Sequence, residues 1–134
     1  MDYRNLTPAD EALVARAAEV IKRNYDGVTF RHTVGAAVRC INGAVYTGVN
    51  VYSLHGACAE VIAIGAALSA GEREFECVVA VGGEKSNELY PPCGNCRQFL
   101  IDYAPSCEVI VSSEAGPRKV RVADLLPLAY HTEF

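Results

Sequence analysis

The chain has 134 residues, 51% of them hydrophobic and 21% charged, which predicts one globular domain spanning residues 1–134. The net charge is −4 and no run of basic residues occurs, so nucleic acid is disfavoured as the main ligand and a small neutral or cationic ligand fits better. No apolar stretch of about twenty residues is present, and the polar, acidic start MDYRNLTPADEA is not a secretory signal, so we expect a cytoplasmic protein with no membrane partner.

Residues 6–27 are predicted to form the first helix. Thr7 is a suitable N-cap, Pro8 suits the first turn, and Asp10 stands at the capping-box position. The apolar residues that recur at helical spacing are Leu13, Ala17 and Ile21. Gly27 ends the segment.

The rest of the chain alternates strands and helices. Residues 33–52 are predicted to form a β-hairpin, because Asn42-Gly43 lies between two apolar runs and is typical of a two-residue turn. The remaining predicted elements are a helix in 57–72, a buried strand in 75–83, a loop in 84–92, a helix in 93–105, a strand in 107–113, and an edge strand with a short helical piece in 116–130. This alternation predicts an α/β fold with a mixed sheet layered by helices.

Six cysteines occur, and in a cytoplasmic protein they indicate metal binding, catalysis or plain core packing rather than disulfides. Three lie inside apolar runs and are expected to be buried core thiols: Cys40, Cys77 and Cys107. The other three, Cys58, Cys93 and Cys96, lie in polar or glycine-containing segments, so a chemical role is expected for them.

Those three cysteines lie where predicted helices begin. Cys93 and Cys96 are three residues apart at one helix N-terminus, which places both sulfurs on one face, and Cys58 starts another helix. The positive end of a helix dipole favours the thiolate form. If both helices open at the same edge of the sheet, three thiolates converge on one metal, and soft sulfur ligands select zinc.

The number of ligands distinguishes a catalytic zinc from a structural one. Structural zinc normally has four protein ligands, whereas three leave a position for water. Glu60, two residues after Cys58, is then placed to carry a proton. Two alternatives remain open from the residues: a redox Cys-x-x-Cys pair, which leaves Cys58 and Glu60 unexplained, and a structural zinc with His55 as fourth ligand.

Five motifs together resemble the zinc-dependent cytidine deaminase family: VGAAV at 34–38, TGVNVY at 47–52, CAE at 58–60, PCGNCRQ at 92–98 and LLPLAY at 125–130. The similarity runs from about residue 8 to residue 130. It implies a three-layer α/β/α fold, one Zn²⁺ per subunit on the three cysteines, and a homotetramer. The implied reaction is hydrolysis of the 4-amino group of a cytosine nucleoside or analogue, as in pyrimidine salvage, with Glu60 moving the protons.

The pattern departs from nucleoside-type cytidine deaminases in the segment that holds the sugar. Such enzymes typically read Asn-x-Glu-Asn there, whereas this chain has Asn50, Val51 and Tyr52, as blasticidin S deaminases do. His32 stands where a Phe is usual. The resemblance implies that Asn50 contacts the substrate, while Tyr52 either lines the pocket or packs on a strand. The substrate is therefore open among cytidine, deoxycytidine and an analogue such as blasticidin S.

Three further residues enter through the resemblance. Ala59, between Cys58 and Glu60, and Tyr130, in the tail motif, are expected at the substrate, Tyr130 from a neighbouring subunit. Val61 stands where an Arg usually offsets thiolate charge, so we expect Arg97 to support the zinc site instead, against the alternative of a solvated surface Arg. The competing functional class is a non-catalytic zinc-binding or Cys-x-x-Cys redox module.

Overall fold

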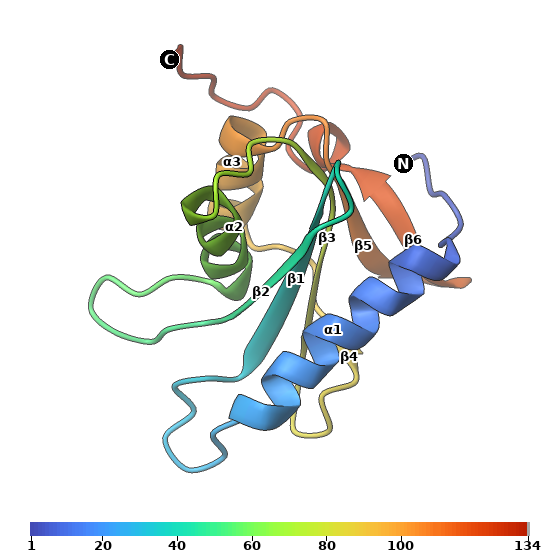
Figure 1. The fold of residues 1–134 in the computed structure, drawn as a ribbon. Coiled ribbons are helices and arrows are strands. Elements are labelled where there is room, and N and C mark those ends of the chain that lie inside the picture. Colours follow the sequence, from blue (N-terminus) through green and yellow to red (C-terminus); the bar gives the residue numbers. More distant parts are fainter. Residues whose placement is uncertain (134) are drawn as a thin grey trace.

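The structure, a computed structural model that describes residues 1–133, has three layers with a mixed sheet in the middle (Figure 1). The helices are α1 (Pro8–Asn24), α2 (Ala59–Ser69), α3 (Gly94–Tyr103) and the 3₁₀ helix η1 (Val122–Leu125). The strands are β1 (Val34–Cys40), β2 (Val45–Val49), β3 (Phe75–Gly82), β4 (Glu88–Leu89), β5 (Glu108–Ser113) and β6 (Gly116–Arg121). The predicted α/β/α architecture is confirmed.

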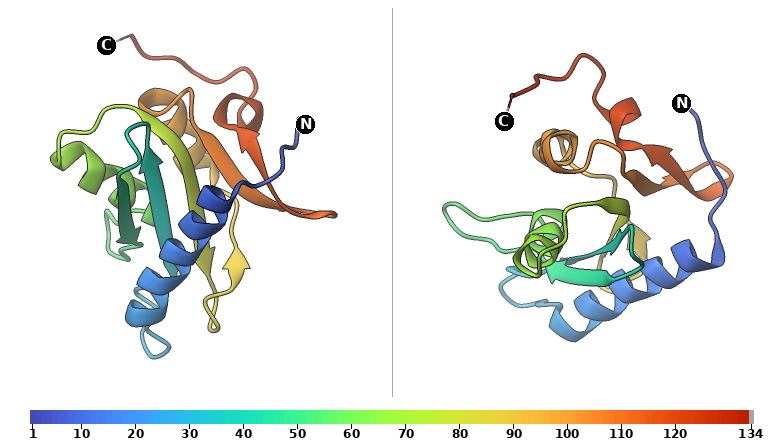
Figure 2. Two further views of the ribbon diagram at one scale, coloured as in Figure 1. Left: turned by 45° about the vertical axis from the view of Figure 1, so that its right-hand side comes forward. Right: turned by 45° about the horizontal axis from the view of Figure 1, so that its top comes forward.

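The sheet has the order β2-β1-β3-β5-β6, with β4 paired to β3 outside this path. Strands β3 and β5 are parallel, and the other neighbours are antiparallel. Helix α1 covers one face of the sheet, while α2 and α3 lie against the opposite face (Figure 2). Two cores result, because successive side chains of a strand point to opposite faces. Ala37 and Val79 face α1, whereas Ala36 and Val78 face α2 and α3.

The β1–β2 hairpin has a three-residue connection rather than the two-residue turn predicted from Asn42-Gly43. Cys40 N–H donates to the carbonyl of Ala44 at 2.8 Å, and this bond encloses residues 41–43. Gly43 has φ +89°, which is the left-handed conformation that closes such a loop. Ile41, the apolar residue just before Asn42, is exposed in this connection and does not belong to the strand.

Helix α2 lies very close to the hairpin because β2 contains glycine at the crossing. A Cβ atom built on Gly48 would lie 2.6 Å from the backbone nitrogen of Ala63, in the middle of α2. Only glycine allows this approach. The hairpin thereby supports the helix whose first turn carries Cys58 and Glu60.

Helix α1 begins as predicted, with Thr7 as N-cap and a reciprocal capping box to Asp10. Asp10 is fully buried, and its carboxylate lies 2.8 Å from Arg39 Nη2 and 2.8 Å from Lys119 Nζ. Burial by itself raises the pKa of Asp10, but hydrogen bonds from Lys119, the Thr7 backbone N–H and Arg39 outweigh it and lower the pKa. The carboxylate therefore ties α1 to β1 and β6.

We expect Asp10→Asn to lower the free energy of unfolding by about 3–5 kcal/mol at pH 7, because it leaves two nearly buried cations without their anion. The pKa of Asp10 is depressed on folding, so its contribution is present above about pH 4 and is lost as pH falls. Urea unfolding at pH 7 and pH 3 measures both effects. Glu19→Gln, which removes an exposed ion pair to Arg23, is the control and should change little. A similar loss in both variants would contradict the assignment.

The segment 84–92, predicted as a loop, contains the short strand β4. Its residues Glu88 and Leu89 pair with Gly82 and Val81 of β3, and Tyr90 N–H then donates to the Ala80 carbonyl at 3.0 Å. The polar residues Ser86 and Asn87 precede this strand, so the sequence around it shows little of the alternation typical of a strand. The pairing directs the chain from β3 toward the start of α3.

Candidate active site

Three cysteine sulfurs lie together where two helices begin. Cys58 is the N-cap of α2, Cys93 is the N-cap of α3, and Cys96 lies in the first turn of α3. Their Sγ atoms all lie within 4.8 Å of one another, and those of Cys58 and Cys93 are 3.6 Å apart. The three cysteines expected to be core thiols are buried and lie outside this cluster: Cys40, Cys77 and Cys107.

The chemistry of these thiols fits a soft cation. Burial raises the pKa of Cys58 and of Cys96, and the Glu60 carboxylate adds to this effect at both. Burial acts against the thiolate of Cys93 as well, but hydrogen bonds to its sulfur, including those from the Cys96 and Asn95 backbone N–H groups, lower its pKa overall. The hydrogen bonds at the N-terminus of α3 thus outweigh the effect of burial on the pKa only at Cys93. A cation such as Zn²⁺ supplies the charge that keeps all three as thiolates.

Glu60 lies in the first turn of α2, directly beside this cluster. Its side chain is buried, with only 6% of the residue exposed, and burial raises the pKa of its carboxyl group. A carboxylate with a raised pKa accepts a proton more readily than an ordinary carboxylate does and can release it again. Glu60 therefore has the environment of a proton carrier.

A pocket of about 330 Å³ opens beside the cysteines and Glu60. It is lined by Val34, Asn50, Tyr52, Cys58, Ala59, Glu60, Ala80, Tyr90, Pro91 and Cys93. A larger hollow of about 720 Å³ lies between α1, β4 and β6, but no thiol lines it, so we place the active site at the smaller pocket. The smaller pocket is mainly apolar with a few polar groups, as ligand sites usually are.

Four of the lining residues were not predicted from the sequence: Val34, Ala80, Tyr90 and Pro91. Tyr90 contributes an aromatic wall, and its hydroxyl donates to Glu88 at 2.9 Å. A sequence signal for it existed, because Tyr90 lies only three residues before Cys93. The pairing of β4 with β3, which brings Tyr90 to the pocket, was not visible in the sequence.

Asn50 lines the pocket, and it also holds the adjoining segment in place. Its Oδ1 accepts hydrogen bonds from the backbone N–H groups of Thr33 and Val34 at 2.8 and 2.9 Å, and its Nδ2 donates to Thr33 Oγ1 at 3.2 Å. One Nδ2 hydrogen remains for a ligand. Asn50 thus positions residues 33–34 at the pocket rim.

The remaining expected residues are placed as follows. Tyr52 is 65% exposed and lines the pocket edge, while His55 lies in an exposed turn outside the three-cysteine cluster. Arg97 donates from Nε to the Pro92 carbonyl at 2.8 Å and from Nη1 to the Leu125 carbonyl at 3.0 Å. Tyr130 is exposed, and its backbone carbonyl accepts from Gln98, so its ring does not line the pocket of its own chain within residues 1–133.

Three thiols around a metal position, a buried carboxylate and an adjoining pocket define a zinc-dependent hydrolytic enzyme. Residues 7–112 match the family model described as the cytidine and deoxycytidylate deaminase zinc-binding region. The chain belongs to this family. The match and the three-cysteine cluster together show a zinc-dependent deaminase that holds one Zn²⁺.

Relatives and solved structures agree with this assignment. The chain is 36% identical to blasticidin-S deaminase of Bacillus cereus, over 94% of this chain and 95% of that protein. It is 37% identical to cytidine deaminase of Mycobacterium tuberculosis, over 75% of this chain and 74% of that protein. The crystal structure of cytidine deaminase from Burkholderia pseudomallei has a TM-score of 0.73 and 32% identity, covering 93% of this chain and all of that one.

Proposed function

We propose that this protein hydrolyses the 4-amino group of a cytosine ring carried by a small molecule, giving the uracil form and ammonia. One observation carries the proposal: Glu60 and two cysteines of the cluster, Cys58 and Cys93, line the same pocket, which is large enough for a pyrimidine ring and its substituent, and Cys96 lies buried beside them. No helix within residues 1–133 is long and apolar enough to cross a membrane.

Cys58, Cys93 and Cys96 would hold the zinc ion. A zinc ion held there would act as a Lewis acid that lowers the pKa of the attacking water. Glu60 accepts a proton from the water and delivers it to N3 of the ring, and it then carries the proton of the new C4 hydroxyl to the departing amine as the C4 carbonyl forms. Each turnover consumes one water, breaks the C4–N bond and releases one ammonia. General acid–base help of this kind contributes about 10²–10⁴ in rate.

The individual substrate is the finer part of the proposal. Tyr52, which replaces an acidic residue expected at the sugar, supports a cytosine nucleoside analogue over ordinary cytidine. A parallel assay of cytidine, deoxycytidine and blasticidin S, followed by loss of the cytosine absorbance band and by ammonia, tests it. The predicted order has blasticidin S first by kcat/KM, and a preference for cytidine would overturn that order. Absence of ammonia from all three with zinc-loaded protein would overturn the proposed reaction.

A homotetramer is the proposed assembly. Its support is the resemblance to the cytidine deaminase family, and exposed apolar side chains on loops are available for an interface: Val28, Leu54 and Leu128. The exposed ring of Tyr130 is then free to reach the pocket of a neighbouring subunit. Mass photometry measures the assembly directly, and a monomer at micromolar concentration would contradict the proposal.

Arg97 is proposed to support the zinc site by fixing the backbone just before Cys93 and by adding positive charge there. We expect Arg97→Gln to weaken zinc affinity about tenfold, because outer groups around a metal commonly contribute about 10–100-fold. Competition with a chromophoric chelator measures this. The matched control is Arg73→Gln, since Arg73 also donates to backbone carbonyls but lies after α2, away from the cysteines. Unchanged zinc affinity and turnover in Arg97→Gln would show that Arg97 is only a surface residue.

A further inference from the structure

A second hollow adjoins the active-site pocket on its outer side. It has a volume of about 480 Å³ and is lined by Thr29, Phe30, Arg31, Thr33 and Tyr52. Tyr52 also lines the inner pocket, so the two spaces meet at its ring. The loop between α1 and β1 and the loop after β2 form this rim and project on the same side of the molecule (Figure 1). A ligand whose base fills the inner pocket can extend past Tyr52 into this hollow.

Four of the five residues that line the outer hollow have a hydrogen-bond donor in the side chain, Phe30 being the exception, and none has a carboxylate. Arg31 supplies a guanidinium group, and among residues 1–133 no acidic side chain forms an ion pair with it. The hydroxyl of Thr33 accepts from Asn50, which leaves its own hydrogen to donate, and Tyr52 adds an exposed hydroxyl. Of these groups only the Arg31 guanidinium cannot accept a hydrogen bond, so it is the group that favours an acceptor, and its charge favours an anion.

The nearest acidic residue in this loop, Asp26, is occupied by the loop itself. Its carboxylate accepts from the Thr29 hydroxyl and from the backbone N–H groups of Val28 and Thr29, both at 2.9 Å. These hydrogen bonds, with a smaller contribution from the backbone N–H of Arg31, lower the pKa of Asp26 to about 2, so the carboxylate is ionised at neutral pH and occupied by the loop. Asp26 therefore shapes the loop and does not line the hollow.

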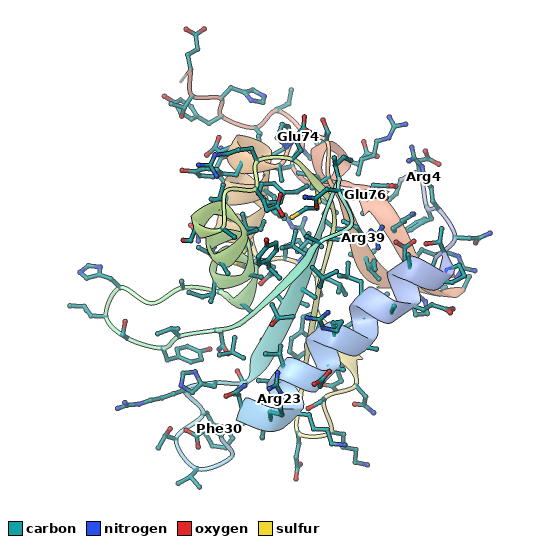
Figure 3. All side chains as sticks on the ribbon, viewed as in Figure 1. Arg4, Arg23, Phe30, Arg39, Glu74 and Glu76 are labelled. Carbon is teal, nitrogen blue, oxygen red and sulfur yellow. The ribbon has the colours of Figure 1, made fainter. Side chains whose placement is uncertain are left out.

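The segment that carries Arg31 is anchored on both sides. Asp26 N–H donates to the His32 carbonyl at 3.0 Å, and His32 Nδ1 lies 2.8 Å from the Asn50 carbonyl. A carbonyl can only accept, so His32 Nδ1 is the donor in that bond. Phe30, next to Arg31, has φ +57° and lies exposed on this loop (Figure 3). The backbone of Arg31 is thus held at the rim before any ligand arrives, which lowers the ordering cost of binding.

We propose that Arg31 is a specificity-determining residue that binds an anionic group, a carboxylate or a phosphate, on the substituent attached to N1 of the cytosine ring. The inference rests on the proposed function, because the ring must occupy the inner pocket for its substituent to reach Arg31. The net charge of −4 for the whole chain favours cationic ligands only in general, and it does not describe this locally basic hollow.

The test compares substrates that differ only in one charge. Cytosine linked to a sugar carboxylic acid, its uncharged amide and the sugar phosphate are assayed with the zinc-loaded parent, Arg31→Gln, Arg31→Lys and the control Arg23→Gln. Arg23 is an exposed arginine on α1 that does not line the hollow. The parent should prefer the acid to the amide by about five- to tenfold in kcat/KM. Arg31→Gln should bring this ratio to about one, Arg31→Lys should keep part of it, and Arg23→Gln should leave it intact.

The carboxylate and phosphate arms show which anion is preferred, and a preference for either supports the inference. Equal kcat/KM for acid, phosphate and amide in the parent would overturn it while leaving the deaminase intact. A ratio that survives in Arg31→Gln would overturn it as well. If no compound releases ammonia, the proposed function fails. The role of Arg31 is then tested by calorimetry, which measures the Kd values of the corresponding uracil acid and amide. Equal Kd values overturn the role of Arg31, and tighter binding of the acid that depends on Arg31 supports it.

Discussion

Replacing Glu60 with Gln is expected to lower kcat for cytosine deamination by about 10²–10⁴, while zinc content stays at one ion per chain. Gln has nearly the same shape but cannot accept a proton from water or deliver one to the ring. Glu60, with 6% of the residue exposed, is the only carboxylic acid among the residues that line the pocket, so no other lining carboxylate can take over the transfer. Pre-steady-state and steady-state assays of ammonia release measure the loss.

Zinc analysis of the same preparation separates a chemical loss from a loss of the metal. Glu84→Gln is the matched control, because Glu84 is exposed in the segment after β3 and does not line the pocket. Its kcat should equal that of the parent. Turnover by Glu60→Gln within a fewfold of the parent would remove Glu60 from the proposed mechanism.

Cys96→Ser is expected to reduce zinc affinity by more than about 100-fold and to abolish ammonia release, since even groups outside the first ligand sphere contribute about 10–100-fold. Cys96 is fully buried in the first turn of α3, so no neighbouring water-exposed group can replace it easily. The loss of zinc affinity is measured as the zinc content, by mass spectrometry, after dialysis against a chelator.

The control for this substitution is Cys40→Ser, at a thiol that is equally buried but lies in β1 outside the cluster. It should retain one zinc per chain, although it costs some stability because a polar group replaces a core thiol. Full zinc retention by Cys96→Ser, or zinc loss by both variants, would contradict the assignment of ligands.

Most helices and strands could be predicted from patterns within short segments of the sequence. The capping box at Thr7 and Asp10, the buried run of β3 and the helices that begin at Cys58 and Cys93 follow from short-range patterns, and the structure has all of them. The placement of three cysteines at two helix starts also followed from local spacing, once both helices were expected at one edge of the sheet.

Features that depend on contacts between distant segments were not predictable in the same way. The pairing of β4 with β3 brings Tyr90 to the pocket, although residues 84–92 show no strand pattern. Asn50 uses most of its amide to hold Thr33 and Val34, seventeen and sixteen residues away. Burial of Cys96 opposes its thiolate form, which a helix start alone does not reveal.

If this protein hydrolyses a cytosine ring at the pocket that Glu60, Cys58 and Cys93 line, the oxygen added at C4 comes from water. In the most direct measurement, zinc-loaded protein is incubated with a cytosine nucleoside or its analogue in water enriched in oxygen-18, and the mass of the product is measured by mass spectrometry. We expect one oxygen-18 atom at C4 of the uracil product and one ammonia for each molecule formed. A product without the label, or no conversion by protein that holds one zinc per chain, would contradict the account.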